Sequence, residues 1–142
     1  KQQLLFELVQ VGYDEHRRWV HEALQSAGDD PLAQVRAMTE AHVLVHLAYP
    51  DLAKVTSREA RALNPDDRAR LSAVLAGTER MLLDVVERGV QLGVLQCDQP
   101  RLAASAIGAM GVRAAEWWTP DGAFTAEQVA DAYAHYAVKL LT

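Results

Sequence analysis

The sequence predicts an all-α fold, a bundle of six helices that closes with a helical hairpin. Every strong hydrophobic periodicity has helical spacing, and no run alternates with period two. Helix start signals recur between the periodic segments: Asp30-Pro31, Asn64-Pro65, Asp98-Gln99-Pro100 and a capping box that begins at Thr125. Together they predict helices over residues 1–27, 31–48, 50–63, 65–91, 99–118 and 125–141. No linker is long enough to divide residues 1–142 into two domains.

Composition limits the classes of function. The chain has 142 residues, half of them hydrophobic, which is enough for one domain with a core. Its net charge is −5, and Lys and Arg are scattered among Asp and Glu, so this segment has no electrostatic footprint for nucleic acid. No apolar run is long enough to span a membrane, and the start has no signal-peptide pattern. The single cysteine, Cys97, suits a reducing compartment, so we expect a cytoplasmic protein without membrane contact.

The first four helices each have an amphipathic or charged pattern. The first ends at Ala27-Gly28, and the third is charged through Lys54, Arg58 and Arg61, a face that is more typical of solvent than of an anionic ligand. The fourth has a broad apolar face between Leu71 and Gly89. Apolar stripes on the first two helices are Leu5, Leu8, Gly12, His16, Trp19 and Ala23, then Leu32, Val35, Thr39, His42 and His46.

The last two helices are joined by the turn Trp117–Gly122, and we expect them to form an antiparallel hairpin. One face of the fifth helix has only small residues, Ala104, Gly108, Gly111 and Ala115. Two glycines in a helix cost roughly 1 kcal/mol each relative to Ala, so close approach of another helix should compensate. That helix could belong to the same subunit or to a second one.

His42 and His46 are the sharpest pair of polar residues. Their i, i+4 spacing places both imidazoles on one helix face, where they could bind a transition metal if His16, His21, Cys97 or a carboxylate converged on them. No Cys-x-x-Cys or His-Glu-x-x-His motif accompanies them, so ordinary core or pocket histidines are favoured and no metal or other cofactor is expected. Because no catalytic triad, Glu-x-x-His pair or phosphate loop is present, we do not expect an enzyme.

Three passages in order resemble the C-terminal ligand-binding and dimerisation domain of TetR-type transcriptional regulators. Residues 1–9 look like the segment that follows the family's helix-turn-helix, and residues 89–100 are similar to the passage into its eighth helix. Residues 113–130, which contain Trp117-Trp118-Thr119-Pro120-Asp121-Gly122, look like a junction found in a subgroup that includes regulators of lipid and sterol catabolism.

The resemblance implies the sensing domain of a bacterial repressor whose N-terminal DNA-binding part lies outside this chain. It implies a homodimer formed by the last two helices and a hydrophobic effector, with a fatty acyl or sterol-derived thioester as the suggestion from the subgroup. The effector would tilt the first helix. The alternatives are a freestanding helical carrier or adaptor and a metal sensor that uses His42 and His46.

The resemblance also places the effector pocket among the first, second, fourth and fifth helices. Helical phase then selects the residues that would line it: His16, Trp19, Met38, His42, His46, Met81, Val85, Ile107 and Met110. The residues expected at the dimer interface are Ala104, Gly108, Gly111, Ala115, Tyr133 and Ala137.

Overall fold

A computed structural model describes residues 1–142 and contains six α-helices and no strand, which confirms the predicted all-α fold. A short 3₁₀ turn, η1 (Ala60–Ala62), continues the third helix. The helices are α1 (Gln2–Ser26), α2 (Pro31–Ala48), α3 (Pro50–Glu59), α4 (Pro65–Gln91), α5 (Pro100–Trp117) and α6 (Ala126–Leu140).

Side chains cap three of these helices as predicted. Asp30 accepts hydrogen bonds from two backbone N–H groups in the first turn of α2, and Asn64 accepts one in the first turn of α4. Thr125 and Gln128 bond reciprocally in a capping box at the start of α6. The prediction that Asp98 caps α5 is wrong, because that helix begins one residue later than expected and has no side-chain cap.

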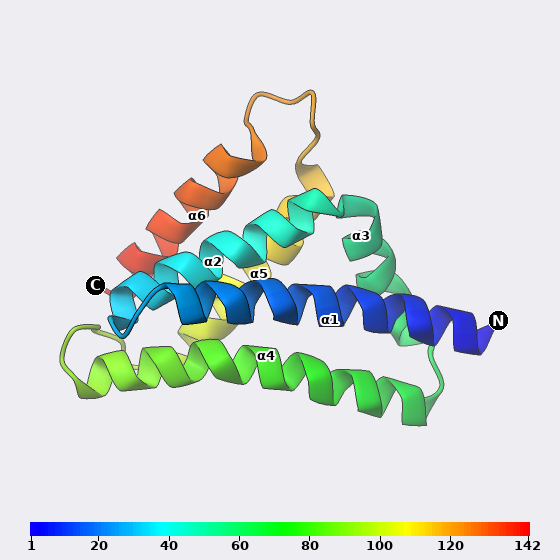
Figure 1. Ribbon diagram of the computed structural model, residues 1–142, viewed down its shortest axis with the longest axis horizontal. Coiled ribbons are helices and arrows are strands. Elements are labelled where there is room, and N and C mark those ends of the chain that lie inside the picture. Colours follow the sequence, from blue (N-terminus) through cyan, green and yellow to red (C-terminus); the bar gives the residue numbers. More distant parts are fainter.

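The central element of the fold is α2, which packs against α1, α4, α5 and α6. In Figure 1, α1 lies between α2 and α4, and α5 passes behind them. The main core forms where α2, α4, α5 and the end of α6 meet. Its fully buried side chains include Val35, Met38, Val86, Ile107 and Leu141.

The turn after α5 reverses the chain, but α6 then packs chiefly against α2 and only slightly against α5 (Figure 1). Small side chains explain this arrangement. Ala130, Ala134 and Ala137 are buried on the inner face of α6, so the helix can approach α2 closely. Arg36 of α2 also pairs with Asp131 of α6 at the surface.

The small-residue face of α5 packs within the subunit. A Cβ added at Gly111 would lie 2.4 Å from the His42 ring of α2, so any larger residue would displace that ring. Gly111, Ala115 and Ala137 are buried inside the subunit, and the prediction that they form the dimer interface is therefore wrong. Ala104, Gly108 and Tyr133 are partly exposed.

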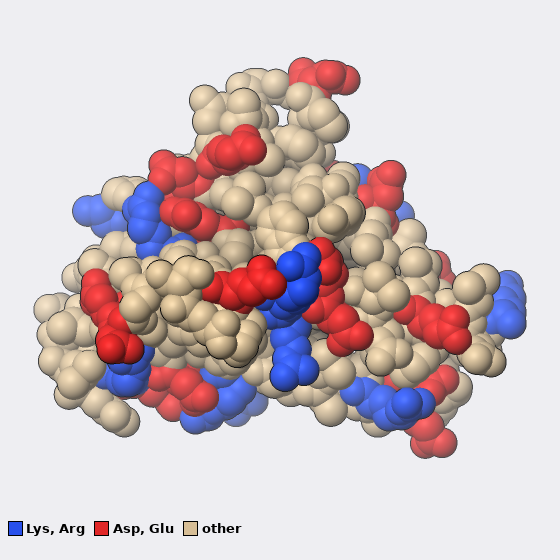
Figure 2. Space-filling model, in the orientation of Figure 1, with Lys and Arg blue, Asp and Glu red and all other residues tan.

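The surface carries charges of both signs. Figure 2 shows blue Lys and Arg side chains interspersed with red Asp and Glu on the visible face. Several of these charges form exposed ion pairs, such as Arg80 with Asp84 and Glu87. None of the helices is both long and apolar enough to cross a lipid bilayer.

Candidate functional site

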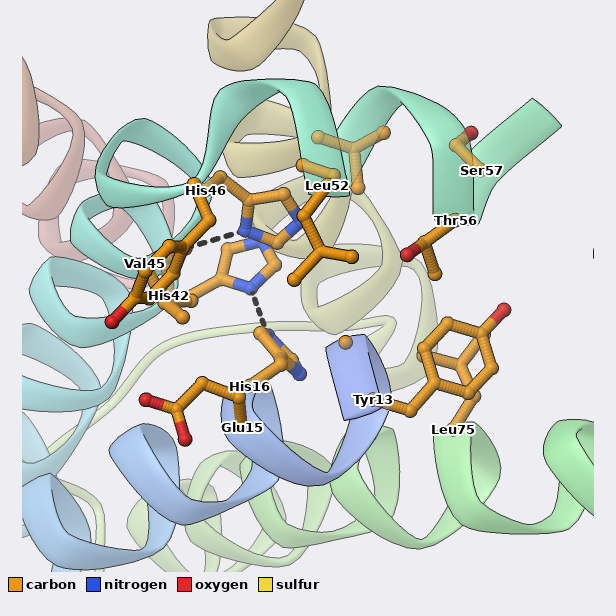
Figure 3. A pocket seen from close by; sticks show the side chains of 14 residues that line it. Tyr13, Glu15, His16, His42, Val45, His46, Leu52, Thr56, Ser57 and Leu75 are labelled. Atoms are coloured by element: carbon orange, nitrogen blue, oxygen red, sulfur yellow. Dashed lines mark hydrogen bonds between the residues drawn. The ribbon is translucent and has the colours of Figure 1, made fainter. Parts of the chain in front are cut away.

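A cavity of about 170 Å³ lies between α1, α2 and α3, and single residues of α4 and α5 complete its wall (Figure 3). Apolar side chains such as Leu52 and Leu75 form most of its lining. Histidines gather at one end of the cavity, and Tyr13 and Thr56 stand at the other (Figure 3). The complete lining is Gly12, Tyr13, Glu15, His16, His42, Val45, His46, Tyr49, Leu52, Ala53, Thr56, Ser57, Leu75 and Val112.

Three imidazoles form the polar end of this cavity, His16 from α1 and His42 and His46 from α2. His42 Nε2 lies 2.8 Å from the Gly108 carbonyl oxygen, and His46 Nδ1 lies 2.7 Å from the His42 carbonyl oxygen. His16 Nε2 lies 2.6 Å from His42 Nδ1. The three ring centroids are 4.6 to 5.3 Å apart, so the rings touch edge to face.

These histidines are neutral at pH 7. Burial, followed by repulsion from His46, lowers the pKa of His16 to about 4. Burial likewise lowers the pKa of His42 well below its ordinary value and lowers the pKa of His46. The nearby Glu15 carboxylate does not favour charged imidazoles, because it pairs with Arg18 and accepts a hydrogen bond from Trp19 Nε1.

Two glycines shape the site. Gly111 leaves space on α5 for the His42 ring, as described above. Gly12 does the same on α1 for α3, because an added Cβ would lie 2.6 Å from Thr56 Oγ1. The buried Thr56 hydroxyl has no hydrogen-bond partner in the protein, which is costly for a polar group out of water.

The structure brings together only three of the nine predicted pocket residues, namely the histidines. Trp19 lies beside Glu15 and does not line the cavity. Met38 and Ile107 are fully buried in the main core, and Met110 packs against that core. The last two predicted residues, Met81 and Val85, line a different hollow.

That second hollow, of about 480 Å³, is more open and more polar than the histidine cavity. It lies beside the turn between α1 and α2, where Arg88 of α4 donates hydrogen bonds to the Asp29 carbonyl and to the side chain of Gln34. Because these contacts already engage its polar groups, the second hollow is the weaker candidate for a ligand site.

Sequence reasoning missed the contribution of α3. Lys54 and Arg58 of α3 and Arg61 of η1 are charged and predict a solvated face, and they do not line the cavity. The opposite face of α3 supplies Leu52 and Thr56 to the site. Leu52 and Thr56 have the i, i+4 spacing of residues on one helix face, and this spacing is the sequence signal that indicates a shared inward face.

Comparison with known proteins gives the family. The family model described as "Tetracyclin repressor-like, C-terminal domain" matches residues 28–141. The chain belongs to this family. A search of curated proteins gave no significant match.

Solved structures of TetR-family regulators share the fold of this tetracyclin repressor-like domain. A regulatory protein from Rhodococcus RHA1 superposes with a TM-score of 0.92 at 19% identity, over 99% of this chain and 73% of that chain. AibR, solved with isovaleryl coenzyme A and operator DNA, superposes with a TM-score of 0.84 at 24% identity, over 95% of this chain and 73% of the AibR chain. The ketosteroid regulator KstR2 of Mycobacterium tuberculosis superposes with a TM-score of 0.87 at 19% identity, over 99% of this chain and 72% of the KstR2 chain.

The protein is therefore a ligand-binding C-terminal domain of a TetR-family transcription regulator. This family is a class of regulators and not of enzymes. Of the two hollows described above, the histidine cavity is the less open one, and it has both a mainly apolar lining and convergent polar groups, as ligand sites usually have.

Proposed function

We propose that this tetracyclin repressor-like domain senses a short acyl compound, carried as a thioester, in the histidine cavity. Binding controls a DNA-binding part of the same repressor, and the domain acts as a homodimer. The observation that carries the proposal is the unpartnered Thr56 hydroxyl, which is buried beside Gly12 in the wall of a cavity whose surface is mainly apolar.

The polarity of the cavity fits an acyl group. Leu52, Leu75 and Val45 would cover the hydrocarbon chain, whose burial contributes about 25 cal/mol per Å² of apolar surface. The Thr56 hydroxyl can donate to a carbonyl oxygen, which relieves the cost of burying it without a partner. An ester or thioester supplies that oxygen and carries no charge into the cavity.

The size of the cavity favours a short chain. A protein cavity of about 150 Å³ holds a molecule as small as benzene. At about 170 Å³, the histidine cavity suits an acyl group of a few carbons better than a steroid nucleus. AibR, which shares the fold, was solved with isovaleryl coenzyme A, and a branched five-carbon acyl group of this kind is our first candidate.

The position of the cavity suggests how a ligand would act. Its walls include α1 and α3, which touch through Gly12 and Thr56. A ligand that binds one spacing of these helices better than another shifts the population toward it, and α1 moves with the change. The shift is limited by the difference in affinity between the two arrangements.

Thermal unfolding with a panel of coenzyme A thioesters tests the proposal. The panel contains acetyl, isovaleryl, octanoyl, palmitoyl and steroid-derived acyl groups, with free coenzyme A as the control. A ligand at 100 times its Kd stabilises the folded state by about 2.7 kcal/mol, which raises Tm by several degrees. We expect this rise with short acyl groups only. A panel without any rise, or a rise with free coenzyme A alone, would contradict the proposal.

Thr56→Val tests the role of the hydroxyl. This substitution keeps the side-chain shape and removes the unpartnered oxygen, so the ligand-free protein should be as stable or up to about 1 kcal/mol more stable. Isovaleryl coenzyme A should bind roughly tenfold more weakly in calorimetry. Ser72→Ala on α4 removes an exposed hydroxyl away from the cavity and should leave both quantities unchanged.

A further inference from the structure

The three cavity histidines also have the arrangement of a metal site. One ring nitrogen from each of His16, His42 and His46 lies within 4.8 Å of the other two. They come from two packed helices, α1 and α2, so the backbone holds them together (Figure 3). Sequence spacing alone indicates the pair on α2, and the fold adds the third imidazole.

Hydrogen bonds to carbonyl groups orient two of the rings. A carbonyl oxygen can only accept, so His42 carries its proton on Nε2, facing Gly108, and has a bare Nδ1. His46 carries its proton on Nδ1, facing the His42 carbonyl, and has a bare Nε2. Metal-binding histidines usually donate their second ring N–H to a carbonyl or carboxylate in this way.

The environment keeps the nitrogens available. Burial lowers the pKa of all three imidazoles, to about 4 for His16, so they are uncharged at pH 7 and keep their lone pairs. No carboxylate competes for them, since Glu15 is engaged by Arg18 and Trp19. The cavity wall next to the rings is mainly apolar.

We propose that His16, His42 and His46 together bind one divalent transition-metal ion of the zinc and cobalt class, with the fourth coordination position facing the cavity. Neutral imidazoles suit these ions and do not suit magnesium or calcium, which require oxygen ligands. Three protein ligands and one open position form the usual arrangement of an accessible zinc site. This inference is independent of the acyl effector, because the metal needs only the three side chains.

Binding requires a small rearrangement. Tetrahedral coordination with metal–nitrogen distances of about 2.0–2.1 Å places the nitrogens roughly 3.4 Å apart. His16 Nε2 and His42 Nδ1 are 2.6 Å apart, so the ion must replace their hydrogen bond and separate the rings. The His16 proton moves from Nε2 to Nδ1, and all three ligands stay neutral, so no proton is released above about pH 6.5.

Cobalt(II) titration of the metal-free full chain, with no acyl ligand present, tests the inference. We expect the visible absorption of four-coordinate cobalt, saturation at one ion per chain, and displacement by zinc(II). His16→Gln and His46→Gln should each weaken binding by about tenfold or more. His21→Gln and His135→Gln change exposed histidines outside the cavity and are the matched controls. Absence of the cobalt spectrum, or equal weakening by the control variants, would overturn the metal site.

A second measurement uses the unmodified protein, so it tests the metal site even if the histidine variants fail to fold. Long-range ¹⁵N NMR reports the imidazole nitrogens directly. Zinc(II) should shift the resonances of His16, His42 and His46 and leave those of His21 and His135 in place. Shifts confined to the two exposed histidines would overturn the site. Because no thioester is present in either experiment, the outcomes are separate from those of the effector panel.

Discussion

At the scale of single residues, two glycines on α5 have opposite surroundings. An Ala Cβ at Gly111 would lie 2.4 Å from the buried His42 ring, whereas at Gly108 it would meet nothing within 4 Å. We predict that Gly111→Ala lowers the free energy of unfolding by about 1–3 kcal/mol, because the ring and its bond to the Gly108 carbonyl must shift.

Gly108→Ala is the control for this prediction. Ala favours a helix by roughly 1 kcal/mol over Gly, so this substitution should be neutral or stabilising. Urea unfolding of both variants gives the comparison. Equal effects of the two substitutions would show that His42 does not pack against Gly111.

The buried histidines make stability depend on pH. In the folded state their pKa values lie below the ordinary value of about 6.5, and that of His16 is about 4. Between about pH 6.5 and the lowered folded-state values, the unfolded chain therefore binds more protons than the folded chain. Stability is therefore complete above about pH 6.5 and falls as the pH decreases toward 4. Each such histidine contributes a slope of up to about 1.4 kcal/mol per pH unit.

Urea unfolding at pH 7.5, 6.0 and 5.0 measures this slope. His16→Gln should reduce it, whereas His21→Gln, at an exposed position on the same helix, should not change it. A stability that is constant from pH 7.5 to 5.0 would contradict neutral burial of the cluster.

At the scale of elements, the contact between α1 and α3 is set by Gly12 and Thr56. Gly12→Ala places a Cβ 2.6 Å from Thr56 Oγ1, which is too close for either atom to stay in place, and should destabilise the protein by about 1–3 kcal/mol. Thr56→Ala in the same chain removes the clashing atom. The double variant should therefore be more stable than the sum of the single effects predicts, as measured by a double-mutant cycle. Additive effects would mean that α3 moves away freely.

The helices could be predicted from sequence because their signals are local. Asp30, Asn64 and Thr125 cap the helices that they precede, and each signal spans only a few residues. Asp98 offers the same kind of signal but is not used, since Pro100 alone marks the start of α5.

The candidate site was less predictable because it depends on packing between helices. The spacing of His42 and His46 is a property of one helix and could be read directly. The positions of Thr56 and Leu52 depend on how α3 docks, and those of Met38 and Ile107 depend on which apolar stripe the core uses. Periodicity identifies an apolar face without identifying its partner, which explains why Gly111 and Ala115 were assigned to a subunit interface.

At the scale of the whole molecule, homodimers are typical of the family, and we propose that this one uses the outer faces of α5 and α6. Large apolar side chains remain exposed there, with Leu102 67% exposed and Tyr136 56% exposed. We predict that Tyr136→Arg converts the dimer to a monomer at micromolar concentration, because it places a charge in an apolar interface. Light scattering measures the mass.

Leu92→Arg controls for the general effect of a charge on an exposed apolar site. Leu92 is 61% exposed in the turn after α4 and belongs to neither α5 nor α6. Its variant should stay dimeric, and circular dichroism should show unchanged helix content in both variants. A Tyr136→Arg variant that remains a dimer would place the interface elsewhere.

The geometry of α1 makes it a mechanical lever. The turn that follows α1 is held near α4, because Arg88 contacts Asp29 in that turn and Gln34 of α2, and this fixed end provides a pivot. At 1.5 Å per residue, His16 lies about 15 Å from Ser26 along the helix, and Gln2 lies about 36 Å from Ser26. A push of about 1 Å at His16 therefore becomes roughly 2.4 Å at Gln2. The cavity lies partway along this lever, so a small ligand or a single ion that moves α1 at His16 produces a larger displacement of its N-terminal end.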